Sequence, residues 1–297
     1  MINNVVIFGT IPPPIGGVTK SIENLLNALI VKNITVEIFS KRSLFKRYDI
    51  AHIHYSKSWK RFAGLIIGKL LAKKVIFTLH GNKYNNDFFN RINSKISDGV
   101  IFLNATVYEK YSNKFKSSII LTSLFKEGIK SCSNNSNMLE KNPEKDYLLI
   151  YAYDKVYQDG KDIYGVDFIL NHIDRLEEKY VIVLLDPKKG YESDIENISK
   201  EKLLYIGHEI DFLSLLNEVD IYIRPTSTDG NSVAVQEALM FGKKVVASNV
   251  VERAKEVITY KYEDFDDFEN KLSDNVDNAN TYEPDSIEKY LDYIGKL

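Results

Sequence analysis

The sequence predicts an α/β protein made of two doubly wound domains. Short β-branched runs such as NVVIFG (4–9) and DIAHIHY (49–55) alternate with longer amphipathic stretches, which is typical of β-α-β units and a parallel sheet. The strands are continuously apolar, so both faces of each sheet are expected to be buried. A polar, aperiodic stretch at 130–146 interrupts the alternation, which then starts again.

The expected elements follow from periodicity. In the first half we expect a helix at 18–31 and strands at 4–9, 34–39, 49–55, 74–81 and 99–103. After the linker we expect helices at 165–178 and 211–219, and strands at 147–153, 180–185, 203–207, 220–225 and 243–248. The predicted domains are therefore 1–129 and 147–283, joined by the linker 130–146. A last helix within 284–297 is expected to pack back towards the first domain.

Composition restricts the classes of partner. The chain has 297 residues and a net charge of −2, which argues against a general nucleic-acid binder. Residues 1–146 contain 22 Lys+Arg and 10 Asp+Glu, a balance of +12, whereas the remainder has 17 and 31, a balance of −14. The basic first half is therefore expected to face something anionic. The lone Cys132, the absence of a signal-peptide pattern and the absence of a bilayer-length apolar run favour a cytoplasmic location.

The most informative stretch is RPTSTDGNSVAVQEALMFGKKVVAS, residues 224–248. Asp229 and Gly230 fall on a loop at a strand's carboxyl end, and a helix is expected to begin near Asn231 or Ser232 and to stop at Gly242. The first turn of that helix offers unpaired N–H groups and a positive dipole end, which suit a diphosphate. Glu237 lies further along the helix, so the two acids bracket the anion site, as a nucleotide sugar requires.

This stretch resembles the carboxylate motif of retaining GT-B glycosyltransferases of the large family 4, particularly bacterial enzymes of capsule and O-antigen assembly. The resemblance implies that Glu237 binds the donor ribose and that Asp229, where the family usually has Glu, is a catalytic-site acid on the donor sugar hydroxyls. The backbone from Gly230 through Asn231 and Ser232 to Val233 would then hold the diphosphate. It also implies a UDP- or GDP-linked donor, no metal and no further cofactor.

Other motifs extend the resemblance over most of the chain. Gly16 and Gly17 match the family's Gly-Gly loop before the first helix, and His80 in TLHGN matches a strand-end His-Gly at the catalytic site. His52 and His54 are expected to be structural. Where the family has Lys-Gly, this chain has Tyr164-Gly165, and the diphosphate contact is left open among Lys155, Lys161 and Arg224.

The segment SKSWKRFAGLIIGKLLAKK, residues 56–74, carries basic and apolar groups on different sides of a helix. Such a helix could lie on an anionic membrane surface. It could equally pack its apolar side on the sheet.

Together these observations predict a retaining glycosyltransferase that moves a sugar from a nucleoside diphosphate donor to a glycan or lipid-linked acceptor in surface polysaccharide biosynthesis. Two alternatives share the fold. One is a non-catalytic subunit of a glycosyltransferase complex, and the other is a nucleotide-sugar 2-epimerase.

Overall fold

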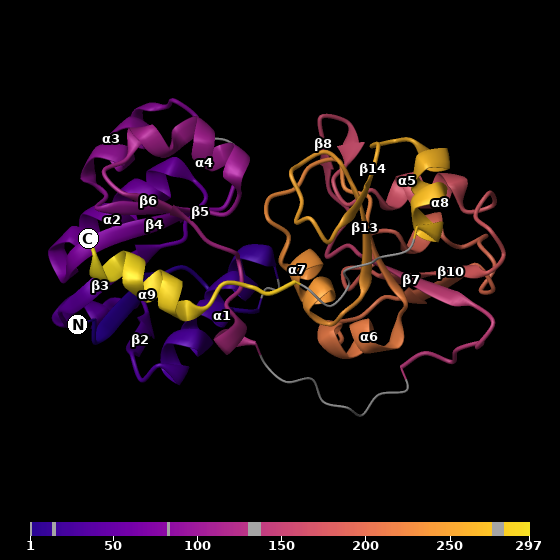
Figure 1. Ribbon diagram of the computed structural model, residues 1–297, viewed down its shortest axis with the longest axis horizontal. Coiled ribbons are helices and arrows are strands. Elements are labelled where there is room, and N and C mark those ends of the chain that lie inside the picture. Colours follow the sequence, from indigo (N-terminus) through magenta and orange to yellow (C-terminus); the bar gives the residue numbers. More distant parts are fainter. Residues whose placement is uncertain (1, 14–15, 82–83, 130–137, 275–281) are drawn as a thin grey trace. The chain divides into compact units, whose positions relative to one another are not determined.

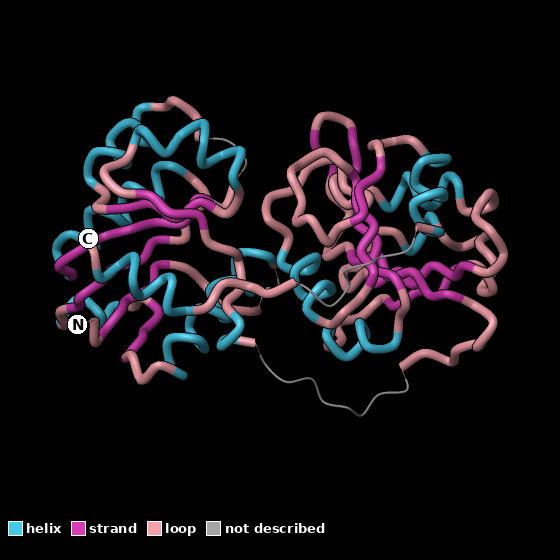
Figure 2. The backbone as a smooth tube through the Cα atoms, in the orientation of Figure 1, coloured by secondary structure: helices cyan, strands magenta, loops and turns pink. Residues whose placement is uncertain are grey.

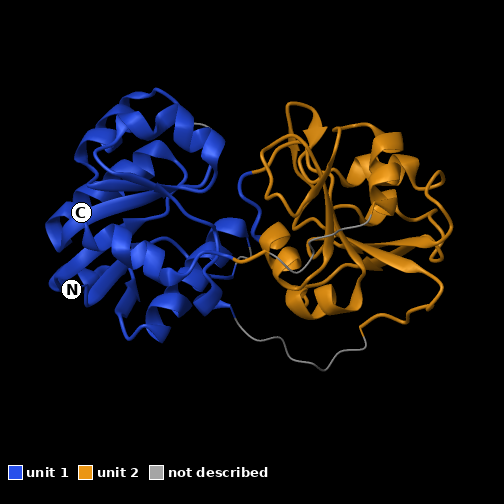
Figure 3. Ribbon diagram, in the orientation of Figure 1, with its two compact units in different colours: residues 1–130, 230–233, 284–297 blue, residues 131–229, 234–283 orange. Residues whose placement is uncertain are grey.

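The computed structural model describes residues 2–13, 16–81, 84–129, 138–274 and 282–297 (Figures 1 and 2). The chain forms two compact units. Unit 1 comprises residues 1–130, 230–233 and 284–297, and unit 2 comprises residues 131–229 and 234–283 (Figure 3). Each unit is built around one six-stranded parallel sheet, so the predicted doubly wound α/β class is confirmed.

The sheet of unit 1 has the strand order β2-β1-β3-β4-β5-β6. Its strands are β1 (Asn4–Phe8), β2 (Thr35–Ile38), β3 (Tyr48–Ile53), β4 (Ala72–Leu79), β5 (Gly99–Phe102) and β6 (Ser118–Ile120). Its helices are α1 (Gly17–Val31), α2 (Ser58–Leu71), α3 (Phe88–Ile96), α4 (Ala105–Tyr111) and α9 (Ile287–Gly295). From β1 the chain adds β2 on one side of the sheet and then β3, β4, β5 and β6 on the other side. The strand order therefore reverses between β1 and β3.

Helices cover both faces of this sheet. Ile7 and Ile50 share one apolar cluster with residues of α1 and α9, and α9 (yellow in Figure 1) lies among the indigo and purple elements of unit 1. Phe8 and Ile53 belong to the cluster on the other face, which includes residues of α2 and α4. Burial on both faces explains why the strands are apolar throughout.

Unit 2 has the strand order β11-β10-β7-β12-β13-β14, in which the first strand of the unit is central and the order reverses between β7 and β12. Its strands are β7 (Asp146–Tyr151), β10 (Tyr180–Leu185), β11 (Leu203–Ile206), β12 (Ile221–Arg224), β13 (Lys244–Ser248) and β14 (Ile258–Tyr260), with a small hairpin of β8 (Tyr157–Gln158) and β9 (Lys161–Asp162). Its helices are α5 (Val166–His172), α6 (Phe212–Glu218), α7 (Val233–Met240) and α8 (Phe265–Ser273). This is the strand order of dinucleotide-binding folds, whose ligands lie at the carboxyl ends of the strands where the order reverses.

The helix predicted at 165–178 is shorter in the structure. The α-helix α5 ends at His172, and the chain continues in tighter turns, with N–H groups donating three residues back, as from Arg175 to the His172 carbonyl at 2.9 Å. The predicted linker lies partly outside the described residues, at 130–137. In its described part, the backbone N–H groups of Met138 and Leu139 donate to the Glu218 carboxylate at 2.8 Å each.

No helix in the described part of the chain combines the length and the apolar character needed to cross a bilayer.

Gly165, at the start of α5, gives a stability prediction. Its φ is +72°, and a Cβ there would lie 1.9 Å from the Pro225 carbonyl oxygen. We expect Gly165→Ala to lower the free energy of unfolding by more than about 2 kcal/mol, because strain at positive φ adds to a backbone clash. Urea denaturation measures the loss.

Gly160 is the matched control. Its φ is +76°, but an added Cβ would meet nothing within 4 Å. Gly160→Ala should therefore cost only the strain of positive φ, about 1–2 kcal/mol. Equal losses in the two variants would contradict the role assigned to the Gly165–Pro225 contact.

Candidate functional site

A carboxylate held by two arginines lies at the carboxyl edge of the sheet in unit 2. Arg224 is the last residue of β12, where the strand order reverses, and Asp229 lies five residues later. Arg224 donates to Asp229 through Nε at 3.2 Å and Nη2 at 3.3 Å. Arg253, in the loop after β13, donates to Asp229 Oδ2 through Nη1 at 2.8 Å.

Arg253 was not predicted as a site residue, because no sequence motif marks it. Its side chain is only 4% exposed, and its Nε also donates to the Ser248 carbonyl at 3.4 Å. Its Nη2 is buried and has no hydrogen-bond partner among the described residues. A buried guanidinium N–H without an acceptor is costly, so this donor is suited to an incoming anion.

The two guanidinium groups determine the ionisation of this cluster. Burial alone would raise the pKa of Asp229, but the charges of Arg224 and Arg253 and their hydrogen bonds lower it below its ordinary value. Burial alone would likewise lower the pKa of Arg224, whereas Asp229 raises it further above its ordinary range. Arg224 and Asp229 therefore form a charged pair at neutral pH, and Arg253 adds a second guanidinium group to it.

Tyr164 occupies the position where the resemblance predicts lysine. The Arg224 guanidinium carbon lies 5.5 Å from the centre of the Tyr164 ring, a cation–π contact. Gly165 follows and allows α5 to begin directly against Pro225. Tyrosine at this position thus supports Arg224 from one side and supplies no cation of its own.

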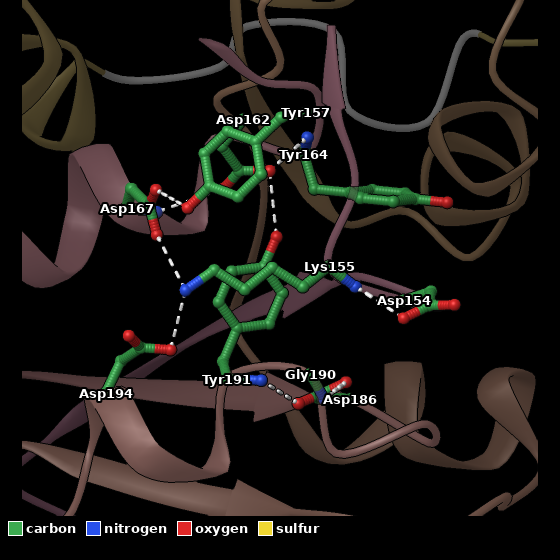
Figure 4. A network of polar contacts seen from close by, with 10 residues as sticks. All are labelled: Asp154, Lys155, Tyr157, Asp162, Tyr164, Asp167, Asp186, Gly190, Tyr191 and Asp194. Atoms are coloured by element: carbon green, nitrogen blue, oxygen red, sulfur yellow. Dashed lines mark hydrogen bonds and ion pairs between the residues drawn. The ribbon is translucent and has the colours of Figure 1, made fainter. Parts of the chain in front are cut away.

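Both lysines proposed as phosphate contacts pair with carboxylates in the structure. The Nζ of Lys155 lies 2.9 Å from Asp194, 3.9 Å from Asp167 and over the ring of Tyr191. Figure 4 shows these side chains together. Lys161 pairs with Glu263 at 3.1 Å, and both side chains of that pair are about half exposed. Of the three cations left open by the sequence, only Arg224 lies in the cluster with Asp229.

The loop of Figure 4 is fixed by buried acids. Asp162 accepts hydrogen bonds from the Tyr164 and Asp167 N–H groups at 3.0 and 3.1 Å and from the Tyr191 hydroxyl at 2.8 Å. Asp186, fully buried, accepts from the N–H of Tyr191 at 2.8 Å. These contacts fix the backbone that carries Tyr164 into α5.

Helix α7 begins at Val233, directly after Ser232, and ends at Met240, just before Gly242 with its φ of +66°. Glu237 lies in its middle and is partly exposed. The preceding stretch, Gly230–Val233, belongs to unit 1 (Figure 3). There the Asn231 side chain donates to the Leu103 carbonyl at 2.6 Å.

In unit 1 the predicted residues lie at two places. Gly16 and Gly17 are exposed at the start of α1, where Gly16 occupies the N-cap position. His80 directly follows β4, and a Cβ on Gly230 would lie 3.1 Å from the His80 carbonyl oxygen.

His80 belongs to a group of three histidines, two of which the sequence analysis treated as structural. His80 Nε2 lies 2.9 Å from Nδ1 of His54, which follows β3, and the rings of His54 and His52 are 4.1 Å apart. His52, on β3, contacts the Thr78 hydroxyl at 2.8 Å and the Tyr290 hydroxyl at 3.1 Å. Burial lowers the pKa of His52 to about 3, and burial together with Arg61 lowers the pKa of His80 to about 4. These rings are therefore neutral at physiological pH.

No group of three or more His, Cys, Asp or Glu side chains suited to a metal ion occurs among the residues that the structure describes.

No protein-family model matches the chain. An uncharacterised 41.2 kDa protein of the capsule (cps) region of Klebsiella pneumoniae is 24% identical over 247 residues, which are 72% of this chain and 63% of that protein. The UDP-Gal:α-D-GlcNAc-diphosphoundecaprenol α-1,3-galactosyltransferase of Escherichia coli is 22% identical over 276 residues, which are 79% of this chain and 69% of that enzyme. The match to the Klebsiella protein thus spans less than two thirds of its length.

Solved structures decide the fold. Anabaena HepE, in complex with UDP, superposes with a TM-score of 0.68 at 12% identity over the whole of both chains. WaaG, a glycosyltransferase involved in lipopolysaccharide biosynthesis, superposes with a TM-score of 0.57 at 11% identity over 94% of each chain. The fold is GT-B. The GT-B architecture predicted from the carboxylate motif is thereby confirmed, and at these identities the likeness concerns the fold alone.

The buried histidines of this GT-B chain predict a pH dependence of stability. Because the folded pKa of His52, about 3, lies below its ordinary value of 6.5, the unfolded chain takes up the proton first as pH falls. The contribution of neutral His52 to the free energy of unfolding is fully present above pH 6.5 and is lost progressively towards pH 3. We expect the free energy of unfolding, from urea titrations, to fall by up to about 1.4 kcal/mol per pH unit for this residue.

Replacing His52 with Gln should make that slope shallower, whereas His208→Gln should leave it as in the wild type, because His208 is exposed. Identical slopes in the wild type and His52→Gln would show that His52 is not the titrating group.

Proposed function

We propose that this protein is a glycosyltransferase that moves a sugar from a nucleoside diphosphate donor to a glycan or lipid-linked acceptor in surface polysaccharide biosynthesis. The GT-B fold supports this proposal, because it is shared with glycosyltransferases. The Escherichia coli relative, which uses UDP-Gal and a diphosphoundecaprenol-linked sugar, supports it further.

The observation that carries the proposal is the Arg224–Asp229–Arg253 cluster. It combines two guanidinium groups with one carboxylate at the strand-order reversal of unit 2, where folds of this strand order bind nucleotides. An excess of positive charge with low exposure calls for an anion, and a diphosphate matches the planar donor geometry of arginine. Tyr164 stands where the resemblance implies a lysine. Arg224, which stacks on Tyr164, would therefore supply the positive charge for the diphosphate.

The acids take the roles implied by the resemblance, with one modification. Glu237 would accept hydrogen bonds from the donor ribose. Asp229 accepts three N–H groups from Arg224 and Arg253, so it would position both arginines in addition to contacting the sugar hydroxyls. The backbone around Asn231 and Ser232 would contact the diphosphate.

The proposed reaction retains the configuration of the sugar. The bond from the anomeric carbon to the diphosphate breaks, and the acceptor hydroxyl forms its bond on the same face. The acceptor proton passes to the departing phosphate oxygen. Arg224 and Arg253 would stabilise the charge that develops on the diphosphate, so the step as drawn needs no metal ion.

Two other functions remain distinguishable by turnover. A non-catalytic subunit would bind the donor and transfer nothing by itself, and a 2-epimerase would change the sugar without an acceptor. Neither has an observation in its favour that the glycosyltransferase lacks.

Donor binding tests the proposal. We expect Arg224→Gln to raise the dissociation constant of the preferred UDP- or GDP-sugar at least about tenfold in calorimetry, because a charged hydrogen bond contributes about 1.5–3 kcal/mol. Glu237→Ala should weaken the same donor, and transfer should require an added lipid-linked glycan.

Lys161→Gln is the matched control, because it removes one positive charge from the same unit at an exposed pair with Glu263. Its donor affinity should stay within about twofold of the wild type. If no UDP-, GDP- or CMP-sugar binds the wild type at saturating concentration, the proposed function is wrong.

We also propose that unit 1 contacts an anionic membrane from the cytoplasmic side. Helix α2 packs on the sheet through small residues, since a Cβ on Gly64 or Gly68 would lie 3.1 or 3.0 Å from side chains of the sheet. Leu65 and Leu71 also pack on the sheet, whereas Trp59, Ile66 and Leu70 face outwards. Helix α3 packs beside α2. The exposed fractions are 53% for Trp59, 42% for Ile66, 70% for Leu70 and 70% for Phe88.

We call this surface the α2–α3 face. The exposed cations of α2, α3 and the residue before α2 are Lys57, Lys60, Lys69, Arg91 and Lys95. Exposed apolar residues together with cations suit the boundary between acyl chains and anionic headgroups. Of the two readings of the segment 56–74, packing on the sheet is seen at Leu65 and Leu71. The exposure of Trp59 and Leu70 supports the proposal that the outer side contacts a membrane.

Vesicle co-sedimentation tests this surface. The triple change Trp59→Ser, Ile66→Ser, Leu70→Ser should reduce binding to phosphatidylcholine vesicles containing phosphatidylglycerol at least about tenfold, because it removes several buried apolar groups. Vesicles of phosphatidylcholine alone should bind the wild type weakly.

The control is Ile30→Ser with Val31→Ser, which alters residues 54% and 59% exposed in α1, the helix that packs on the opposite face of the same sheet. An equal loss in both variants, or binding indifferent to anionic lipid, would rule out the α2–α3 face as the docking surface.

A further inference from the structure

The three histidines of unit 1 form a hydrogen-bonded group whose proton positions follow from the surroundings of His54. His54 is 3% exposed and contacts His80 through Nδ1, with 2.9 Å to His80 Nε2. Its other ring nitrogen, Nε2, is buried and has no hydrogen-bond partner among the described residues. A neutral imidazole carries one proton, so this contact has two arrangements.

In one arrangement His80 donates from Nε2 to His54 Nδ1. The proton of His54 is then on its Nε2, which makes a buried N–H group without an acceptor in the part of the chain that is described. In the other arrangement His54 donates from Nδ1, and its Nε2 is a bare lone pair. Orphaned buried N–H groups are rarer than unsatisfied acceptors, so the second arrangement is favoured.

We propose that His54 is a positioning residue that donates from Nδ1 to His80 Nε2 and thereby holds His80 as a neutral imidazole with its proton on Nδ1. His80 then presents a fixed N–H donor, and its Nε2 is occupied and cannot act as a base. The ligand chemistry that suits such a group is an oxygen acceptor, namely a hydroxyl or phosphoryl oxygen of a sugar nucleotide. This last step rests on the proposed function, whereas the proton positions do not.

Neighbouring contacts prevent His54 from turning away. The His52 ring lies 4.1 Å from the His54 ring, and His52 is itself held by Thr78 and Tyr290. The backbone N–H of His54 donates to the Phe8 carbonyl at 2.9 Å, which ties it to the end of β1. The Arg61 guanidinium, whose charge lowers the pKa of His80, acts in the same sense, because it disfavours a second proton on that ring.

Nitrogen-15 NMR of the full chain with labelled histidine tests the proposal directly. At pH 7, long-range proton–nitrogen correlations should show His80 protonated at Nδ1 and bare at Nε2, and His54 protonated at Nδ1. His80 found protonated at Nε2 would overturn the proposal. This measurement needs neither substrate nor a variant, so it stands whether or not the glycosyltransferase function is correct.

Two variants extend the test. His54→Asn places an amide donor near the position of the imidazole Nδ1 and should keep His80 protonated at Nδ1. His54→Leu removes the donor and should give a mixture of His80 tautomers. Persistence of a pure Nδ1–H form in a folded His54→Leu variant would show that His54 does not set the tautomer.

In the transfer assay, His54→Leu should lower kcat by about threefold to tenfold, the range for one neutral hydrogen bond, and His54→Asn should restore most of the loss. His172→Asn is the control, because the ring of His172 contacts the Phe168 carbonyl in its own helix turn and the neighbouring rings of Phe168 and Phe265 in unit 2. Equal rates in the wild type and His54→Leu would separate the tautomer from catalysis and would overturn the functional half of the proposal.

Discussion

The structure depends on one constraint, which is that each parallel sheet is covered on both faces. Interior strand residues such as Ile7 and Val183 are completely buried, so a polar side chain in the middle of a sheet is costly unless it has a hydrogen-bond partner. The strand ends are therefore the favoured place for polar chemistry. The reversal of strand order opens the carboxyl end in each sheet, and that is where Arg224 of unit 2 and His54 of unit 1 are found.

The two units use this edge differently. Unit 2 keeps charge there, because Asp229 stabilises two guanidinium groups that would be costly to bury alone. Unit 1 keeps neutral hydrogen-bonding groups there, because burial makes a second proton on His52 or His80 unfavourable. A charged cluster is suited to a permanent anion such as a diphosphate. A neutral donor is suited to an oxygen whose charge changes during a reaction.

Much of the architecture could be predicted from the sequence, because long apolar runs and amphipathic stretches have clear periods. Short elements such as β6, β14 and α4 were not identified, since three to seven residues carry too little periodicity. The start of α7 after Ser232 was foreseen from capping chemistry, whereas the end of α5 depends on turns beyond His172 that no local signal marks.

The site shows the same limit. Asp229 and Arg224 were recognised because they share one segment, but Arg253 approaches Asp229 from 24 residues away and lies in no motif. His52 and His54 were placed on the strand 49–55 and expected to be structural. The contact from His54 to His80 joins the ends of two strands, and the pairing of those strands is needed to predict it. Lys155 and Lys161 were plausible as isolated cations, and only the tertiary structure reveals their carboxylate partners.

Helix α9 has a consequence for biosynthesis. Its residues Ile287, Tyr290 and Ile294 complete the core of unit 1, although they are translated after all of unit 2. Domains generally fold as units while the chain emerges from the ribosome, first half first. Here the core of the first unit stays incomplete until the second unit has been translated. Until then His52 also lacks its contact with Tyr290. The helices and strands of the second unit all lie within 138–274, so that unit can close its own core earlier.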